Sequence, residues 1–224
     1  METFASKIID FYRSLQIPLV PKAIEVLYPQ QSEEVMDVVE NFFDKFYNDN
    51  SQRRLIFGIN PGRFGGGTTG INFTAPKQLS EFCHITHPFK PQSELSAEFI
   101  YDLILAYGGV SKFYSDYFVT AVSPLGFVRN GVNLNYYDDK KLQQVITPFI
   151  IDSIRKQISF GFKTDYCFCI GGDKNLKFLS SLNDDHNFFA RIIPLAHPRF
   201  IMQYRRKQKQ KFIEEYLSVL KPVF

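Results

Sequence analysis

The chain has 224 residues, of which 45% are hydrophobic and 22% charged, and its formal net charge is +3. A single domain of this length buries roughly 70% of the unfolded chain's surface. The 24 Phe and 12 Tyr exclude an intrinsically disordered or collagen-like protein. A charge of +3 indicates no partner by itself, so any electrostatic inference depends on where the charges cluster. We predict one domain over residues 1–224.

Cysteine content and the N-terminus narrow the class of protein further. Three cysteines do not complete a set of disulfides, and a Cys-only structural zinc or iron–sulfur site takes four. Met1–Phe4 carries no basic start followed by an apolar run, and no apolar stretch approaches about 18 residues. We therefore expect a cytoplasmic, monomeric protein that binds no membrane, metal or cofactor.

Helical and strand-like patterns alternate along the chain. Apolar residues at three- and four-residue spacing predict a helix that begins at Ser32, and the short apolar run Arg54–Gly58 predicts a buried parallel strand. Residues 1–50 are expected to form a helical extension packed on the domain. Further strands are predicted over Tyr117–Val122, Tyr166–Ile170 and Ile192–Ala196, and further helices over Glu94–Tyr107, Asp138–Ile158, Lys174–Leu182 and Gln203–Leu220. This alternation predicts an α/β fold with three layers, α/β/α, around a mostly parallel four-stranded sheet.

Three segments with distinctive residues leave the predicted strands at their carboxyl ends. They are Gly58–Gly62, Val122–Gly126 and Leu195–Arg199. Ligands of open α/β sheets bind beyond the carboxyl ends of the strands, and the topology brings these segments to one edge. The long irregular stretch Gly62–Pro91 starts at the same edge, and a loop of that length is usually functional. We expect the binding site there.

The residues of these segments resemble those of a known enzyme family. Gly58–Gly65, followed by Gly70–Phe73, is similar to the first motif of the single-strand-selective monofunctional uracil-DNA glycosylases, which belong to the uracil-DNA glycosylase superfamily. His197-Pro198 resembles the start of the second motif of that superfamily. Phe118–Leu125 resembles the middle strand of the family, and Asn133-Leu134 the segment ahead of its next helix. The resemblance covers most of the chain after the first 50 residues.

This resemblance implies a fold, a reaction and the roles of individual residues. The reaction is hydrolysis of the bond between a base and deoxyribose in single-stranded or duplex DNA, after the nucleotide has flipped out of the stack. Asn60 would hold the attacking water, and His197 would donate a hydrogen bond to the base carbonyl that gains negative charge. Gly62, Phe73 and Ile59 would shape the base pocket, with Phe73 stacked on the base. No covalent intermediate with the protein is needed.

One position departs from the family pattern in the middle motif. The family carries an Asn there that reads the edge of the base, and the corresponding residue is Ala121, whose side chain forms no hydrogen bond. Ser123, Thr120 or a backbone group would then contact the base. The departure leaves open a second function, a DNA-binding module that has kept the fold and lost catalysis.

A second departure follows His197-Pro198, where the family's Ser-Pro is replaced by Arg199-Phe200. The segment from Arg199 to Lys211 holds six cations and no acid. We expect these cations to bind DNA phosphates, and an apolar residue near them to be the wedge that replaces the flipped base. The expected phosphate ligands are Arg199, Arg205, Arg206 and Lys207, and the expected wedge is Phe200, Ile201 or Met202.

Two other patterns suggest different chemistry. The run Gly65–Gly70 has the spacing of a dinucleotide fingerprint, which leaves a nucleotide-binding small-molecule enzyme as an alternative function. Such a site needs a helix after the glycines, whereas the sequence of Ile71–Pro76 predicts extended chain. Cys83, His84 and His87 have side chains of the types that bind metal ions, but no fourth ligand is evident. Cys167 and Cys169 alternate along a predicted strand, so we expect both to be buried.

Overall fold

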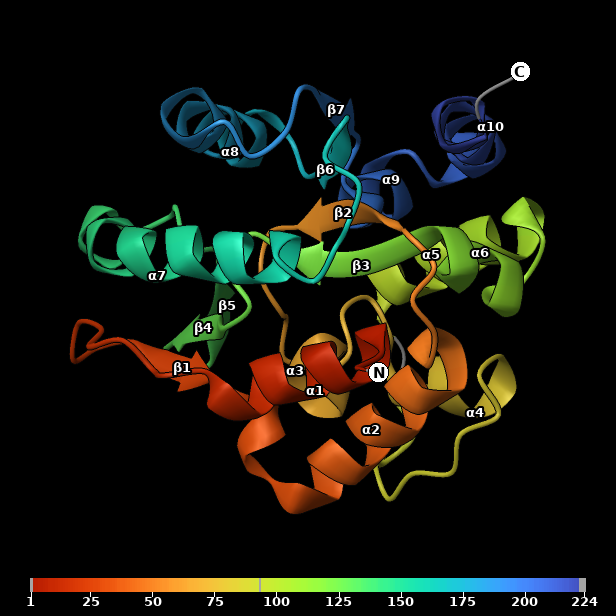
Figure 1. Ribbon diagram of the computed structural model, residues 1–224, viewed down its shortest axis with the longest axis horizontal. Helices are drawn as coiled ribbons and strands as arrows, with labels where there is room; N and C mark the ends of the chain where they lie inside the picture. Colours follow the sequence, from red (N-terminus) through yellow and green to blue (C-terminus); the bar gives the residue numbers. More distant parts are fainter. Residues whose placement is uncertain (1, 93, 222–224) are drawn as a thin grey trace.

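The computed structural model describes residues 2–92 and 94–221 of the chain. Four parallel strands form the main sheet in the order β3-β2-β6-β7. Helices α8 and α10 lie on opposite sides of β6 and β7 (Figure 1). The predicted three-layer α/β/α architecture is therefore confirmed. The strands span Arg54–Gly58 (β2), Tyr117–Ala121 (β3), Cys167–Ile170 (β6) and Ile192–Leu195 (β7), and the two helices span Asp173–His186 (α8) and Lys209–Leu220 (α10).

The register of the main sheet brings the carboxyl ends of its strands to one edge. Gly58 at the end of β2 pairs with Ala121 at the end of β3, and Ile170 at the end of β6 pairs with Leu195 at the end of β7. All four residues of β6 are buried, as expected for an interior strand covered on both faces. The loops that leave these strands therefore meet above the same edge.

The other long helices begin where the sequence provides caps. Glu94 and Asp139 each accept a hydrogen bond from the backbone amide three residues further on, at 2.9 Å, which satisfies an otherwise free N–H at the start of a helix. The predicted helices are found with ends shifted by a few residues. They span Glu33–Tyr47 (α2), Leu95–Tyr107 (α5) and Lys140–Ile158 (α7), with α1 (Phe4–Ser14) ahead of them and α6 (Val110–Asp116) after α5.

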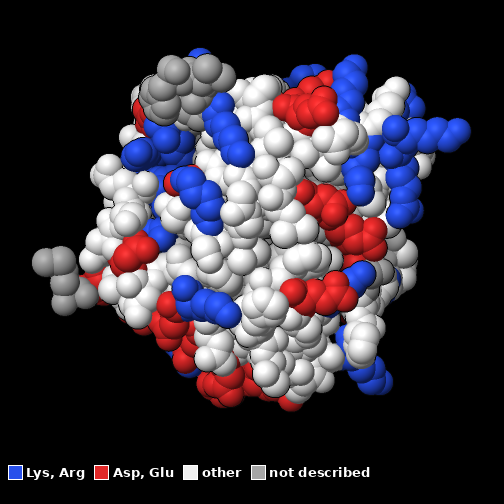
Figure 2. Space-filling model, turned by 90° about the vertical axis from the view of Figure 1, so that its right-hand side faces the viewer, with Lys and Arg blue, Asp and Glu red and all other residues white. Residues whose placement is uncertain are grey.

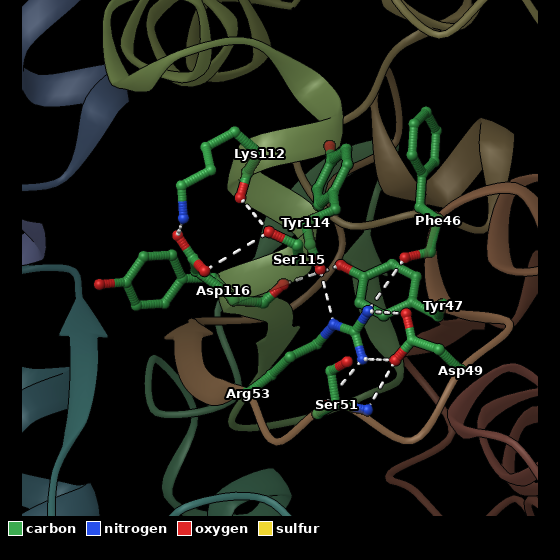
Figure 3. A network of polar contacts seen from close by, with 10 residues as sticks. Phe46, Tyr47, Asp49, Ser51, Arg53, Lys112, Tyr114, Ser115 and Asp116 are labelled. Atoms are coloured by element: carbon green, nitrogen blue, oxygen red, sulfur yellow. Dashed lines mark hydrogen bonds and ion pairs between the residues drawn. The ribbon is translucent and has the colours of Figure 1, made fainter.

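Helices α1 and α2 lie beneath the edge strand β3 (Figure 1). The Tyr47 hydroxyl of α2 donates to the carbonyl of Tyr117 in β3, at 3.0 Å. The buried guanidinium of Arg53 donates to the carbonyls of Tyr114 (2.6 Å) and Phe46 (3.2 Å), and to the carboxylate of Asp49 (2.8 Å), as Figure 3 shows. A buried charge is tolerated when its donors are paired in this way, and the network joins α2 to the segment that leads into β3. That residues 1–224 form one domain stays a prediction, since residues 1, 93 and 222–224 lie outside the described part.

A second, antiparallel sheet was not predicted. It has the strand order β1-β4-β5, with bounds Glu25–Leu27 (β1), Gly126–Arg129 (β4) and Val132–Leu134 (β5). Strands β4 and β5 form a hairpin whose turn residues Asn130 and Gly131 both have positive φ angles, of 51° and 72°. An Asn-Gly pair is a strong hairpin signal, because both residues tolerate this conformation. The hairpin contacts the loop after β2, because the Leu134 carbonyl accepts from Asn60 and the Asn133 side chain accepts from the Arg63 N–H.

Two sequence-based expectations about secondary structure are wrong. The single helix predicted over Gln203–Leu220 is two helices, α9 (Pro198–Tyr204) and α10, separated by Arg205 with φ −133° and a short 3-10 helix over Arg206–Gln208. Both helices pack against α5, and a bend in the cationic segment lets each bury its own apolar side. The irregular stretch Gly62–Pro91 contains α3 (Gly66–Thr69) and α4 (Pro76–Glu81). No helix within the described residues has the length and apolar character needed to span a membrane.

Candidate active site

A cavity of about 520 Å³ lies at the carboxyl ends of the strands of the main sheet. Its walls come from the loop after β2, the end of β3, the Gly171-Gly172 turn after β6, the segment after β7, the start of α5 and the hairpin strand β5. Among the described residues that line it, Glu94 and Arg199 are the only ones with charged side chains at neutral pH. A cavity of this size with few charges suits an uncharged ligand better than a phosphate group.

Asn60 follows the end of β2, and backbone groups at the end of β5 and just after it hold its side chain. The amide nitrogen donates to the carbonyl of Leu134 at 3.3 Å, and the amide oxygen accepts from the backbone N–H of Tyr136 at 3.1 Å. These contacts fix the plane of the amide. An amide oxygen has two lone pairs, so one remains for a water molecule or ligand in the cavity.

Phe73 forms one wall of the cavity from a strained backbone conformation. Its φ angle of 53° lies in the left-handed region, which a bulky residue adopts rarely and at a cost of about 1–3 kcal/mol. The ring lies against Gly58, where an added methyl group would come within 2.7 Å of it, and its centroid is 6.3 Å from that of the His197 ring. Strain of this kind is concentrated at functional sites, which favours a role in binding a ligand.

His197 caps the start of α9 and lines the cavity. Its Nδ1 accepts a hydrogen bond from the backbone N–H of Arg199 at 3.1 Å, so the proton of the neutral ring is on Nε2. Burial lowers the pKa of His197 to about 4, and the positive charge of Arg199 adds to this effect. The hydrogen bond from Arg199 thus indicates the tautomer, and the lowered pKa favours the uncharged ring, neither of which the sequence revealed.

Gly171, after β6, brings the walls of the cavity together. Its φ angle is +114°, and an added methyl group would come within 2.9 Å of Ile59 and 3.4 Å of the His197 ring. Only glycine tolerates both the conformation and the contact. Gly62, Ile59 and Ala121 all line the same cavity as Asn60 and His197. The structure therefore brings together most of the residues that the resemblance placed in the base pocket.

Ser123 and Thr120, the candidates to replace the missing Asn, do not line the cavity. The Ser123 hydroxyl is fully buried and donates to the carbonyl of Leu125 at 2.8 Å. The Thr120 hydroxyl donates to Gln157 of α7 at 2.7 Å, on the other side of β3. Strand alternation turns Thr120 away from the face on which its neighbour Ala121 lines the cavity. Ser123 lies beyond the end of β3, and its buried hydroxyl bonds the local carbonyl because a buried hydroxyl needs a partner.

The lining residues that sequence reasoning missed come mainly from the hairpin and from α5. Asn133 accepts a hydrogen bond from the backbone N–H of Arg63 at 3.1 Å, and its amide nitrogen lies beside Gly62. Asn135 and Tyr137 follow on the same segment, and Glu94 and Ser96 come from the start of α5. The Asn130-Gly131 pair between two apolar stretches is the signal that could have predicted the hairpin.

The segment after His197 forms the rim of the cavity. Arg199, Phe200 and Tyr204 line it, and 44% of Phe200 and 67% of Tyr204 is exposed. Of the three expected wedge residues only Phe200 is available, because Ile201 and Met202 are buried with at most 4% exposed. Their placement outside the rim follows from the helical turn, which directs them toward the core.

The other residues expected to bind phosphates follow the rim residues along the chain. Arg205, Arg206 and Lys207 line a shallow, open surface hollow beside the cavity, and Gln203 and Tyr204 line both. In the described part of the chain, Lys209 pairs with Asp102 and Lys211 with Glu215, whereas no ion pair involves Arg199 or residues 205–207. On the face shown in Figure 2, Lys and Arg side chains gather at the level of α10, with acidic side chains between and below them. Unpaired cations beside a cavity favour an anionic partner.

The two patterns that suggested other chemistry have structural explanations. Gly66–Thr69 forms one helical turn, and an added methyl group on Gly67 would come within 2.7 Å of the Gly62 carbonyl, so glycine allows this turn to support the loop after β2. Among the described residues, no group of three His, Cys, Asp or Glu side chains is placed to hold a metal ion. The three cysteines are free and buried, as expected for Cys167 and Cys169.

Comparison with known proteins agrees with this geometry. Residues 45–221 match the model of the uracil DNA glycosylase superfamily. The crystal structure of wild-type SMUG2 from Pedobacter heparinus is similar over 99% of this chain and 98% of that chain, with 46% sequence identity and a TM-score of 0.95. No curated protein matches the chain. The resemblance inferred from the motifs is confirmed: the chain belongs to the uracil-DNA glycosylase superfamily and has a function of the uracil-DNA glycosylase type.

Proposed function

We propose that the protein is a monofunctional DNA glycosylase that hydrolyses the N-glycosidic bond of uracil or another deaminated base in DNA. The observation that supports this most strongly is that Asn60 and Phe73, from the stretch after β2, and His197, from the distant segment after β7, line one nearly uncharged cavity. A cavity of about 520 Å³ admits a flipped nucleotide. The family relationship supports the same type of reaction.

The proposed reaction breaks one bond and forms one bond without a covalent enzyme intermediate. The bond between C1′ of the sugar and the base nitrogen breaks, and its electron pair leaves with the base as an anion. The oxygen of a water molecule then bonds to the positively charged C1′, and the released proton passes to the base or to solvent. The protein must hold the base, stabilise the leaving anion and position the water.

Asn60 is the residue proposed to position the water. Its amide oxygen keeps one lone pair free beside the hydrogen bond from Tyr136. An amide is a poor base, so its contribution is orientation of the water and not removal of a proton. The backbone contacts to Leu134 and Tyr136 support this role, because they hold the amide in one plane.

His197 is proposed to stabilise the leaving base through its Nε2–H. The neutral ring with the proton on Nε2 is the form that the Arg199 backbone and the lowered pKa favour. Donors aimed at developing negative charge are typically worth about 3–4 kcal/mol of transition-state stabilisation. Phe73 would stack on the base, a contact worth about 1–3 kcal/mol.

DNA is proposed to lie across the rim formed by the segment after His197. Arg199, Arg205, Arg206 and Lys207 would bind phosphates, which is consistent with their lack of ion-pair partners in the described part of the chain. Phe200 would fill the space left by the flipped base, since it is the exposed apolar residue of this segment that lines the cavity. Asn133 and Asn135 are the amides proposed to read the base in place of the Asn that Ala121 replaces.

The test is incubation with oligonucleotides that carry uracil, hypoxanthine or xanthine, scored for strand scission after hot alkali. We expect scission with the parent and little with Asn60→Ala, while both proteins bind the DNA with similar affinity. Ala121 favours a second candidate, a DNA-binding module without catalysis. That candidate predicts salt-sensitive DNA binding with no scission for any of the three bases.

A further inference from the structure

The orientation of the Asn60 amide depends on the position of the segment whose backbone groups bind it. Its two long-range partners, the Leu134 carbonyl and the Tyr136 N–H, are backbone groups at the end of β5 and just after it. They lie 74 and 76 residues further along the chain. The orientation of Asn60 therefore depends on what fixes this segment relative to β2.

The side chain of Tyr136 anchors the segment in the core. Tyr136 is fully buried, and its ring packs against those of Tyr137 and Phe178, with centroids 5.0 and 4.9 Å away. Its hydroxyl donates to the side-chain oxygen of Asn175 at 2.7 Å. Asn175 lies in α8 and is also fully buried, so this bond is formed away from water.

Asn175 connects the same bond to the ends of two strands of the main sheet. Its amide nitrogen donates to the carbonyl of Ile170, at the end of β6, at 3.0 Å, and lies 3.4 Å from the carbonyl of Gly58, at the end of β2. Gly58 precedes Ile59 and Asn60 directly. Asn is a weak helix former and its burial is costly without partners, so packing alone does not account for it at this position.

We propose that Tyr136 and Asn175 are positioning residues, which hold the amide of Asn60 in the orientation needed to place water against the flipped nucleotide. The chain of contacts runs from Gly58 and Ile170 through Asn175 and Tyr136 to the amide. The inference rests on the proposed function, in which Asn60 positions the water. Neither residue lines the cavity, so neither contacts the substrate.

The test uses Tyr136→Phe, which removes one hydroxyl and keeps the ring. Because a misplacement of about 1 Å can cost up to 100-fold in rate, we expect single-turnover base release to fall by about tenfold with unchanged affinity for DNA. The matched control is Tyr47→Phe, which also removes a buried hydroxyl bound to a carbonyl, but beneath β3 and away from the site. Both variants should lose similar stability in urea, and Tyr47→Phe should keep the parental rate.

A double-mutant cycle separates positioning from a general loss of packing. If Tyr136 acts through Asn60, adding Tyr136→Phe to Asn60→Ala changes the residual rate by less than about twofold. An equal loss in the parent and in the Asn60→Ala background would overturn the proposal. So would a loss no larger than that of Tyr47→Phe.

A readout independent of catalysis keeps this inference separable from the proposed function. In ¹⁵N-labelled protein, the Asn60 side-chain amide signals are assigned by their loss in Asn60→Asp. We expect Tyr136→Phe to shift or broaden them and Tyr47→Phe to leave them unchanged. Unchanged signals in Tyr136→Phe contradict the positioning role whether or not the protein releases a base, whereas absence of base release from every substrate contradicts only the proposed function.

Discussion

The charge state of His197 allows the reaction to be tested through its pH dependence. Burial and the neighbouring Arg199 lower its pKa from the ordinary 6.5 to about 4. At pH 7 roughly one molecule in a thousand then carries a charged ring. If the neutral Nε2–H stabilises the leaving base, the rate should not change between about pH 6 and 8. It should fall as the pH drops through about 4, because the protonated Nδ1 no longer accepts the Arg199 N–H.

The same pKa shift makes a prediction for stability. The unfolded chain takes up a proton on this residue below about pH 6.5, and the folded protein does so only near pH 4. The contribution is therefore fully present above pH 6.5 and is lost as the pH falls toward 4, by up to about 3 kcal/mol of unfolding free energy for a pKa lowered from 6.5 to about 4. Urea unfolding of the parent and His197→Ala at several pH values measures this difference.

The kinetic assay is single-turnover base release from a uracil oligonucleotide, followed from pH 4 to 9. His197→Ala should lower the rate at pH 7 by about 10²–10³-fold, the usual effect of removing one such donor. A parental rate that falls about tenfold per pH unit between 6 and 8, with a flat profile for His197→Ala, would refute the neutral-donor reasoning. A His197 ring titration by NMR with a pKa above 6 would do the same.

Three further predictions concern stability, base preference and DNA affinity. Arg53→Met should lower the free energy of unfolding by about 2–5 kcal/mol, because two buried carbonyls lose their donor. Lys112→Met, which removes an exposed ion pair, should lower it by at most about 1 kcal/mol. Urea denaturation measures both changes. Ala121→Asn should sharpen the preference for uracil over hypoxanthine and xanthine, and an unchanged profile of scission would show that other groups read the base. Replacing Arg206 and Lys207 by Gln should reduce the salt slope of single-strand binding by about 1.4, and an unaltered slope would place the DNA elsewhere.

The sequence alone was enough to predict the three layers and the edge of the sheet at which the cavity lies. Short apolar runs such as Arg54–Gly58 are typical of parallel strands buried on both faces, and their carboxyl ends meet at one edge whatever the details of packing. The motifs around Asn60 and His197 then indicated the family. These features depend on residues close together in the chain, which is why they can be read without coordinates.

The hydrogen-bond partners and the protonation of the site residues depend on contacts between distant segments of the chain. The sequence does not show that Asn60 binds backbone groups at the end of β5 and just after it, since those partners lie more than 70 residues away. Periodicity predicts that a residue such as Ser123 lies near a strand end, but not that a local carbonyl takes its hydroxyl. The charge and tautomer of His197 depend on burial and on one backbone N–H. Such properties arise only when the chain has folded, because hydrogen-bond partners and desolvation are set by neighbours in space and not by neighbours in sequence.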